Sequence, residues 1–265
     1  MIIKCDIVDK RMIDDYIGRE YFKCLYLYLD FHQFGTESNI VDVYIQKDND
    51  SVTSISLKYH SALHIYSQKL DFDIDELVGH IRQICPSIIC AERVCIEKLA
   101  PALSKDGYES EFGHIGKMVN FDPSDTDVEI KKACLDDIDS IAELLYSDDD
   151  IGASYSLNDL KQQIYERLST GFVRSYVIKD GERVVCHAGT GAEVVGVSTF
   201  AYLVTDKDYR GKGFGTKITS YTCRELKKDG LEIFSVYYPE NSRRLHHKLG
   251  FEDVCEFGKL YLNIN

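Results

Sequence analysis

Residues 210–216 read Arg-Gly-Lys-Gly-Phe-Gly-Thr and join two regular segments of different character. The segment before them, residues 194–205, is rich in β-branched and aromatic side chains and predicts a strand. Gly196 interrupts that strand and predicts a bulge or a close backbone approach. The segment after them, residues 217–228, has the spacing of an amphipathic helix and is followed by Gly230, a residue that typically ends one.

A glycine-rich loop between a strand and a helix has a definite physical use. Glycines at 211, 213 and 215 let the backbone turn its N–H groups toward one point, because no Cβ atom obstructs them. The first turn of the helix adds N–H groups without intrahelical partners and the positive end of the helix dipole. The loop therefore predicts an anion site that suits a pyrophosphate, with Arg210 and Lys212 at its rim.

Other phosphate-binding loops fit less well. The loop of P-loop NTPases needs Gly-x-x-x-x-Gly-Lys-Ser/Thr, and no such string occurs in the chain. A dinucleotide-binding loop needs Gly-x-Gly-x-x-Gly, whereas the glycines here stand at alternate positions. A glycine-rich turn without a ligand stays open as the plain structural alternative.

A second motif follows the loop in the same half of the chain. Residues 240–251 read Glu-Asn-Ser-Arg-Arg-Leu-His-His-Lys-Leu-Gly-Phe, and residues 231–238 before them have the pattern of a buried strand. The loop and the Lys-Leu-Gly-Phe ending, in this order, resemble the GNAT N-acetyltransferase superfamily. The resemblance covers roughly residues 127–265.

The resemblance implies a fold and a division of the chain. The expected class is α/β in the mixed α+β sense, with a largely antiparallel sheet flanked by helices and with strands four and five splayed apart. Residues 126–265 would form the acetyltransferase domain. Residues 1–125 would form a degenerate GNAT-like module of similar αβ type without a second acyl-CoA loop, and the turn formers around Pro123 mark the boundary.

The resemblance also implies where acetyl-CoA binds. In this family the pantetheine arm enters the gap between the splayed strands and pairs with the backbone of strand four, which corresponds here to Leu203, Val204 and Thr205. The N–H of Leu203 or its neighbour would donate to the thioester carbonyl. The pyrophosphate would be held by the loop, namely Arg210, Gly211, Lys212, Gly213, Phe214, Gly215 and Thr216.

Transfer to an amine needs proton transfers, because an ammonium has no lone pair. Glu193 is the expected general base, with an exposed loop carboxylate as the plain alternative. The family often places a tyrosine on the final helix to protonate the leaving thiolate, and the matching position here is His246. Histidine donates a proton near neutral pH, so it can serve, although a surface histidine is an equal alternative. Tyr237 and Tyr238 are nearby substitutes.

The asparagine that the family has near the end of strand five falls on Pro239 in this chain. Asn241 is the expected replacement in binding the cofactor, unless it only caps the last helix.

Composition limits the partners. The 265 residues include 31 Lys and Arg against 44 Asp and Glu, a net charge of −13, so a nucleic-acid partner is not expected. No apolar run reaches the length of a membrane span, and the first residues lack the pattern of a signal peptide. Nine cysteines without a CxxC pair predict mostly buried, reduced thiols, no metal site and a cytoplasmic protein.

The sequence thus predicts a GNAT-type enzyme that passes the acetyl group of acetyl-CoA directly to a primary amine, with a small-molecule acceptor. The alternative is a catalytically inactive acyl-CoA-binding regulatory or interaction protein. An enzyme with a longer acyl-CoA or a hydroxyl acceptor is also open. Nothing in the sequence supports an oligomer.

Overall fold

The computed structural model describes residues 1–6, 10–36, 40–121, 127–154, 156–171, 173–194, 196–238 and 240–262, and it divides into two compact units. The first unit comprises Met1–Gly116, Tyr237–Arg243 and Asp253–Asn265. The second comprises Lys117–Val236 and Arg244–Glu252. The expected single boundary at 125/126 therefore differs from this division, in which two C-terminal segments belong with the first unit. The proposed boundary residue Pro123 lies outside the described residues.

The two halves of the chain have the same order of main elements: a strand, two longer helices, three strands, a helix, a strand, a helix and a strand. The first half contains β1 (Ile2–Lys4), α1 (Lys10–Ile17), α2 (Leu25–Phe34), β2 (Val41–Asp48), β3 (Ser51–Tyr59), β4 (Ala62–Tyr66), α3 (Ile74–Ile84), β5 (Ile88–Glu92), α4 (Arg93–Leu103) and β6 (Tyr108–Met118).

The second half contains β7 (Lys131–Lys132), α5 (Ile138–Tyr146), α6 (Asp149–Ser154), α7 (Leu157–Thr170), β8 (Ser175–Asp180), β9 (Arg183–Val194), β10 (Val197–Thr205), α8 (Phe214–Lys228), β11 (Glu232–Tyr237), α9 (Glu240–Lys248) and β12 (Phe251–Leu262). The extra helix α6 precedes α7. Short 3₁₀ helices cover Gly18–Cys24, Ser104–Asp106, Leu135–Asp137 and Lys207–Tyr209.

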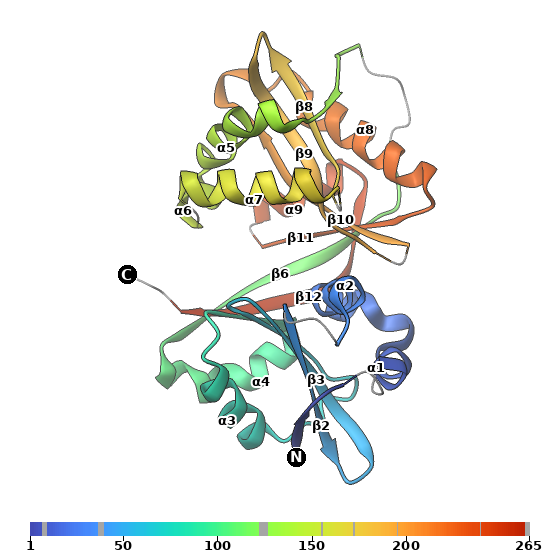
Figure 1. Ribbon diagram of the computed structural model, residues 1–265, viewed down its shortest axis with the longest axis vertical. Coiled ribbons are helices and arrows are strands. Elements are labelled where there is room, and N and C mark those ends of the chain that lie inside the picture. Colours follow the sequence, from blue (N-terminus) through green and yellow to red (C-terminus); the bar gives the residue numbers. More distant parts are fainter. Residues whose placement is uncertain are drawn as a thin grey trace. The chain divides into compact units, whose positions relative to one another are not determined.

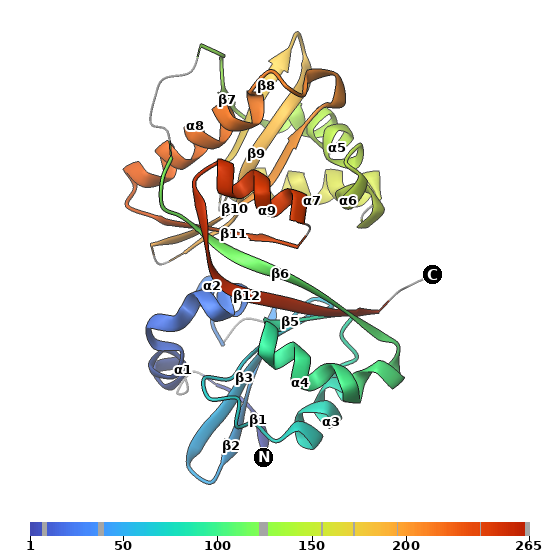
Figure 2. The same ribbon diagram turned by 180° about the vertical axis from the view of Figure 1, so that it is seen from behind.

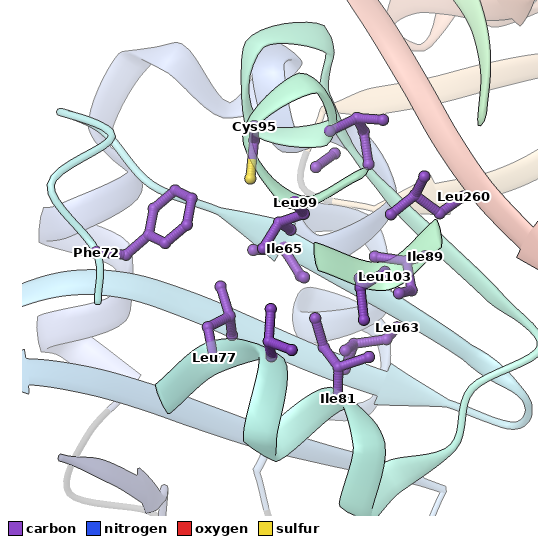
Figure 3. Close-up of a cluster of buried hydrophobic side chains, with 13 residues drawn as sticks. Leu63, Ile65, Phe72, Leu77, Ile81, Ile89, Cys95, Leu99, Leu103 and Leu260 are labelled. Carbon is purple, nitrogen blue, oxygen red and sulfur yellow. The ribbon is translucent and has the colours of Figure 1, made fainter. Parts of the chain in front are cut away.

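The first unit has a sheet with the strand order β1-β2-β3-β4-β5-β12-β6. Helices α1 and α2 pack against one face, and α3 and α4 pack against the other. The core under α3 and α4 gathers leucine and isoleucine side chains from both helices and from the sheet (Figure 3). Leu77 and Ile81 of α3 are fully buried there, as their helical spacing predicts, whereas Ile74 is exposed at the start of the helix.

The second unit has the strand order β11-β10-β9-β8-β7. Helices α5 and α7 cover one face of β8, β9 and β10 (Figure 1), and α8 covers the other (Figure 2). Alternate residues of β8 contribute to the cores on the two faces of the sheet. Val177 packs under α5 and α7, whereas Tyr176 and Ile178 pack under α8. This mixed, mostly antiparallel sheet flanked by helices confirms the expected fold class.

The last strand of the chain belongs to the first unit over most of its length. Strand β12 pairs antiparallel with β5, with Phe257 opposite Glu92. Within the second unit, the N–H groups of Val119 and Asn120 both bond to the carbonyl of Gly250. A Cβ atom on Gly250 would lie 1.2 Å from the Asn120 carbonyl oxygen, so only glycine fits in the Lys-Leu-Gly-Phe sequence.

Three local expectations change in the structure. The periodicity of the tyrosine- and leucine-rich segment 20–34 fits both a helix and a strand, and the segment is helical because α2 buries an apolar face in the first core. The sequence of residues 128–133 predicts a strand, but only Lys131–Lys132 form one. Gly196, with φ of +79°, lies in the turn between β9 and β10 and does not form a bulge inside β10.

None of the helices in the described ranges is long and apolar enough to cross a membrane.

Candidate functional site

Strand β10 has one open edge. It pairs parallel with β11 only through residues 197–199, opposite residues 232–234. On its other side it pairs with β9 as far as Thr205. Within the described chain, residues 200–205 of β10 thus have no partner strand on the β11 side, which is the splay expected between strands four and five.

The open edge presents backbone donors. The N–H of Asp206 bonds to the Val185 carbonyl of β9 at 2.9 Å. Successive N–H groups along a regular strand point to opposite edges, so that of Thr205 points away from β9. The N–H of Thr205 is thus directed toward the open edge and that of Val204 toward β9, while Leu203 lies at the bulge described next.

A bulge precedes these donors. The pairing of β10 with β9 shifts between Ala201 and Val204, and Tyr202 has φ of +58°, a conformation that is uncommon for a bulky side chain. The carbonyl of Tyr202 lies 2.8 Å from Nδ1 of the buried His187. Because a carbonyl only accepts, Nδ1 carries the proton and donates it to Tyr202.

The other ring nitrogen of His187 contacts Ser175. Nε2 lies 2.7 Å from the Ser175 hydroxyl and, being unprotonated in this tautomer, accepts from it. Burial lowers the pKa of His187 to about 4, so the ring is neutral at physiological pH. A Ser175–His187 pair thus holds the bulge of β10 in place.

The glycine loop leads into α8 without a side-chain cap. Gly211 and Gly213 have φ of +80° and +77°, and a Cβ atom on Gly211 would meet nothing within 4 Å. Gly213 is the N-cap residue of α8, and no side chain caps the helix. The N–H groups of Phe214, Gly215 and Thr216 follow the cap and have no intrahelical acceptor, so they are able to bind an anion.

The first half of the chain offers an internal comparison at the equivalent helix. Helix α3 follows β4 as α8 follows β10, but its N-cap is Asp73, whose carboxylate accepts from the N–H of Glu76 at 3.0 Å. A carboxylate already occupies the helix end where an anion would bind. The start of α3 is therefore less suited to an anion than the start of α8.

The start of α8 lies beside the open edge of β10. A Cβ atom on Gly215 would meet Thr205 Oγ1 at 3.6 Å and Leu203 Cδ1 at 4.0 Å. These are ordinary contact distances, so alanine fits there. The expected phosphate end and the expected thioester end of the site are therefore neighbours in the second unit.

The two cationic residues of the loop are anchored. Arg210 donates through Nε to the carbonyl of Thr205 at 3.1 Å. Lys212 Nζ lies 4.2 Å from the ring centroid of Tyr209, whose hydroxyl donates to Asp180. Both positive charges thus stay next to the loop, where they favour an anion.

His246 lies where β10 and β11 separate. It is 8% exposed, so the surface alternative does not describe it, and its Nε2 is 3.0 Å from the hydroxyl of Ser235. Ser235 directly follows the last residue of β11 that pairs with β10. His246 therefore remains a suitable general acid by position.

Glu193 lies at the other end of β10. It is the Cα partner of Ser198, five residues before Leu203, which corresponds to roughly 15 Å along a strand. Its Oε2 accepts from Arg174 Nε at 3.1 Å, and its Oε1 accepts from the Thr190 hydroxyl at 2.8 Å. Glu193 thus accepts hydrogen bonds from two side chains. Its role as the general base stays a prediction, and that role requires a water relay.

The remaining sequence candidates lie in the first unit. Asn241 is exposed on α9, and its Oδ1 accepts from the N–H of Ser242 in the first turn of that helix. The Tyr237 hydroxyl donates to Asp253, and burial, together with that bond, raises its pKa. The structure does not bring Asn241 together with the loop in one unit.

Sequence reasoning did not single out Ser175, His187 or Tyr202. The only local signal is that His187 is a polar residue in an otherwise apolar strand pattern. No group of His, Cys, Asp and Glu side chains in the described part of the chain has the arrangement of a metal site.

Comparison with known proteins supports the class of the fold. Residues 172–253 match the family described as acetyltransferase (GNAT) domain. A search of curated proteins gives no match to the chain.

Several solved structures share the fold over nearly the whole chain at low identity. A Drosophila protein has a TM-score of 0.69 at 11% identity and covers 98% of both chains. A GNAT-family acetyltransferase from Colwellia psychrerythraea has a TM-score of 0.62 at 11% identity and covers 99% of this chain and 100% of its own. A tandem GNAT protein from the clavulanic acid biosynthesis pathway has a TM-score of 0.61 at 10% identity and covers 98% and 97%.

The fold, the splayed strands and the glycine loop agree with the GNAT acetyltransferase domain that matches residues 172–253. The first half of the chain has the same order of main elements as the second half.

Proposed function

We propose that the second unit transfers the acetyl group of acetyl-CoA directly to a primary amine of a small acceptor. The observation that supports this most is the adjacency of two sites: the uncapped start of α8 lies against Leu203 and Thr205 at the open edge of β10. One site suits a pyrophosphate, and the other suits the amide-bearing pantetheine arm and the thioester. The tandem arrangement of a structural neighbour is compatible with a two-module enzyme.

The binding residues have separate roles in this proposal. The N–H groups of residues 211–216 hold the pyrophosphate, with Arg210 and Lys212 adding positive charge. The open edge at residues 203–205 pairs with the pantetheine arm, and Leu203 N–H donates to the thioester carbonyl. That bond strengthens as negative charge develops on the oxygen, and loss of one such donor typically costs about 10²–10³ in rate.

The chemistry then requires two proton transfers. The amine nitrogen attacks the thioester carbon, the C–N bond forms and the C–S bond breaks. His246 donates a proton to the departing sulfur. Glu193 takes the proton of the ammonium through water, because its carboxylate lies too far from Leu203 for direct contact.

Two variants test the chemistry separately from binding. His246→Phe removes the acid, and we expect kcat to fall about 10²-fold or more while the Kd for acetyl-CoA stays within about twofold. Glu193→Gln removes the final proton acceptor, so we expect a smaller loss of kcat. Thiol release with a panel of amines is the measurement.

The Arg174→Lys variant is the control for Glu193, because it disturbs the same ion pair but keeps the carboxylate. Unchanged turnover in both His246→Phe and Glu193→Gln would show that the catalytic assignment is wrong. Acetyl-CoA binding without turnover by the unmodified protein, over a broad amine panel, would instead support an inactive acyl-CoA-binding protein.

A further inference from the structure

A cavity lies in the second unit beside the bulge of β10, between α7 and the sheet. Its empty space is about 420 Å³ including the open mouth, but the part that the centre of a water molecule can occupy is only about 30 Å³. The cavity is therefore narrow. The wall from α5 and α7 is mainly apolar, with Leu145, Leu160, Ile164 and Leu168 beside the polar Gln163 and Arg167.

The opposite wall consists of polar side chains that are already satisfied. Ser175 and His187 bond to each other, and His187 bonds to Tyr202. The Thr190 hydroxyl donates to Glu193 and accepts from the N–H of Arg174. A ligand that enters the cavity thus finds few hydrogen-bond partners among these groups. An apolar group has no hydrogen bonds to lose on entering the cavity.

The charges around the cavity act against a cation. Arg167 and Arg174 both line it, and none of the described residues in the lining is an aspartate or a glutamate. Arg174 is held by Glu193 and Asp229, and the Arg167 guanidinium lies 4.6 Å from the ring centroid of Tyr202. An ammonium in this narrow space would lose its water without gaining a carboxylate.

We propose that this cavity binds a slender, uncharged aliphatic group of a substrate, with any charged end of that substrate left outside. Tyr202 lines the cavity and directly precedes Leu203, so the cavity lies next to the expected reacting end of the site. The group comes either from the acyl chain of the donor or from the carbon chain of the amine. The assignment of the cavity as a substrate subsite rests on the proposed function. The binding of an aliphatic group in the cavity does not depend on that function.

The first experiment tests binding without CoA. The protein is labelled at isoleucine and leucine methyl groups, and n-butanol is compared by NMR with 1,4-diaminobutane, which has the same carbon chain with a charge at each end. We expect n-butanol to shift the methyl signals of Ile164 and Leu160 saturably and 1,4-diaminobutane to leave them in place. Absent shifts with n-butanol, or equal shifts with both compounds, would overturn the proposal.

A variant whose side chain fills the cavity tests whether n-butanol binds there. Ile164→Phe places a larger side chain in the cavity, and we expect it to abolish the n-butanol response at Leu160. Leu144→Phe is the matched control, because Leu144 is buried in the same core cluster but does not line the cavity. An unchanged response in Ile164→Phe would refute the location. The comparison of the two compounds stands on the unmodified protein if a variant fails to fold.

The second experiment finds the source of the aliphatic group. Acyl-CoAs and n-alkylamines of increasing chain length are compared by kcat/KM, and each buried methylene is expected to raise it about fourfold until the cavity is full. A rise in the acyl series that Ile164→Phe removes assigns the cavity to the donor, and a rise in the amine series assigns it to the acceptor. Turnover with no chain-length dependence in either series overturns the subsite and leaves the proposed function intact.

Discussion

His187 is the residue whose contacts explain the shape of the site. Its two ring nitrogens join a serine of β8 to the bulge of β10. Because Tyr202 has a positive φ, the bulge costs backbone energy that this hydrogen bond helps to offset. The position of the Leu203 N–H thus depends on a side chain that takes no part in the proton transfers of our account.

Substitutions at His187 distinguish its two bonds. Asparagine places an amide N–H near the position of Nδ1, so His187→Asn is expected to keep the bond to Tyr202. His187→Leu removes both bonds. We expect kcat to fall about tenfold or more in His187→Leu and clearly less in His187→Asn, with the KM for acetyl-CoA changing less than kcat, measured by thiol release.

Ser175→Ala is the control at the other end of the pair, since it removes only the bond to Nε2. Equal losses of kcat in His187→Asn and His187→Leu would contradict a positioning role through the Tyr202 carbonyl.

Local pattern explains why the glycine loop and α8 can be predicted from sequence. Gly211 and Gly213 have the positive φ that favours glycine, and the helix after them buries Ile218, Cys223 and Leu226 at helical spacing. The bulge cannot be predicted in this way. It depends on Tyr202 meeting His187 across two strands, and no nearby residue in the sequence signals that contact.

Gly215 gives a graded test of the passage between α8 and β10. A Cβ atom there makes only ordinary contacts with Thr205 and Leu203, so Gly215→Ala is expected to bind acetyl-CoA within about threefold of the unmodified protein. Gly215→Leu fills the passage and is expected to weaken binding at least about tenfold. Calorimetric titration measures both Kd values.

Thermal unfolding shows whether both Gly215 variants are folded. Equal affinities in the alanine and leucine variants would mean that acetyl-CoA does not pass between Gly215 and β10.

At the scale of the whole molecule, sequence predicts the number of modules but not how the chain is shared between them. The pairing of Phe257 with Glu92 joins residues far apart in the sequence, and hydrophobic pattern alone does not specify such a partner. The repeated order of elements is visible only once both halves are folded. The sequence itself shows only one part of that comparison, namely the different N-cap residues of the equivalent helices, Asp73 and Gly213.

Buried His187 also predicts how stability depends on pH. Its pKa is lowered by burial from 6.5 to about 4. Between these values the unfolded chain binds a proton that the folded protein does not, so the free energy of unfolding falls as pH falls from 6.5 to 4. The contribution lost is about 3 kcal/mol at most, and this group causes no further loss below pH 4.

Denaturant unfolding of the unmodified protein and of His187→Asn, at pH 7 and pH 4.5, measures this contribution. We expect the unmodified protein to lose more stability over that interval than the variant. Equal losses would show that His187 is not the buried neutral group that the structure describes.

The central claim is that the uncapped start of α8 binds the pyrophosphate of acetyl-CoA, and calorimetric titration of Gly213→Glu tests it most directly. The glutamate places a negative charge at the helix end, whereas Gly230→Glu, at the opposite end of α8, has a similar positive φ and open surroundings and serves as the control. We predict micromolar binding of acetyl-CoA by the unmodified protein and by Gly230→Glu, and binding at least about tenfold weaker in Gly213→Glu. No binding by the unmodified protein, or equal binding by all three, would contradict the account.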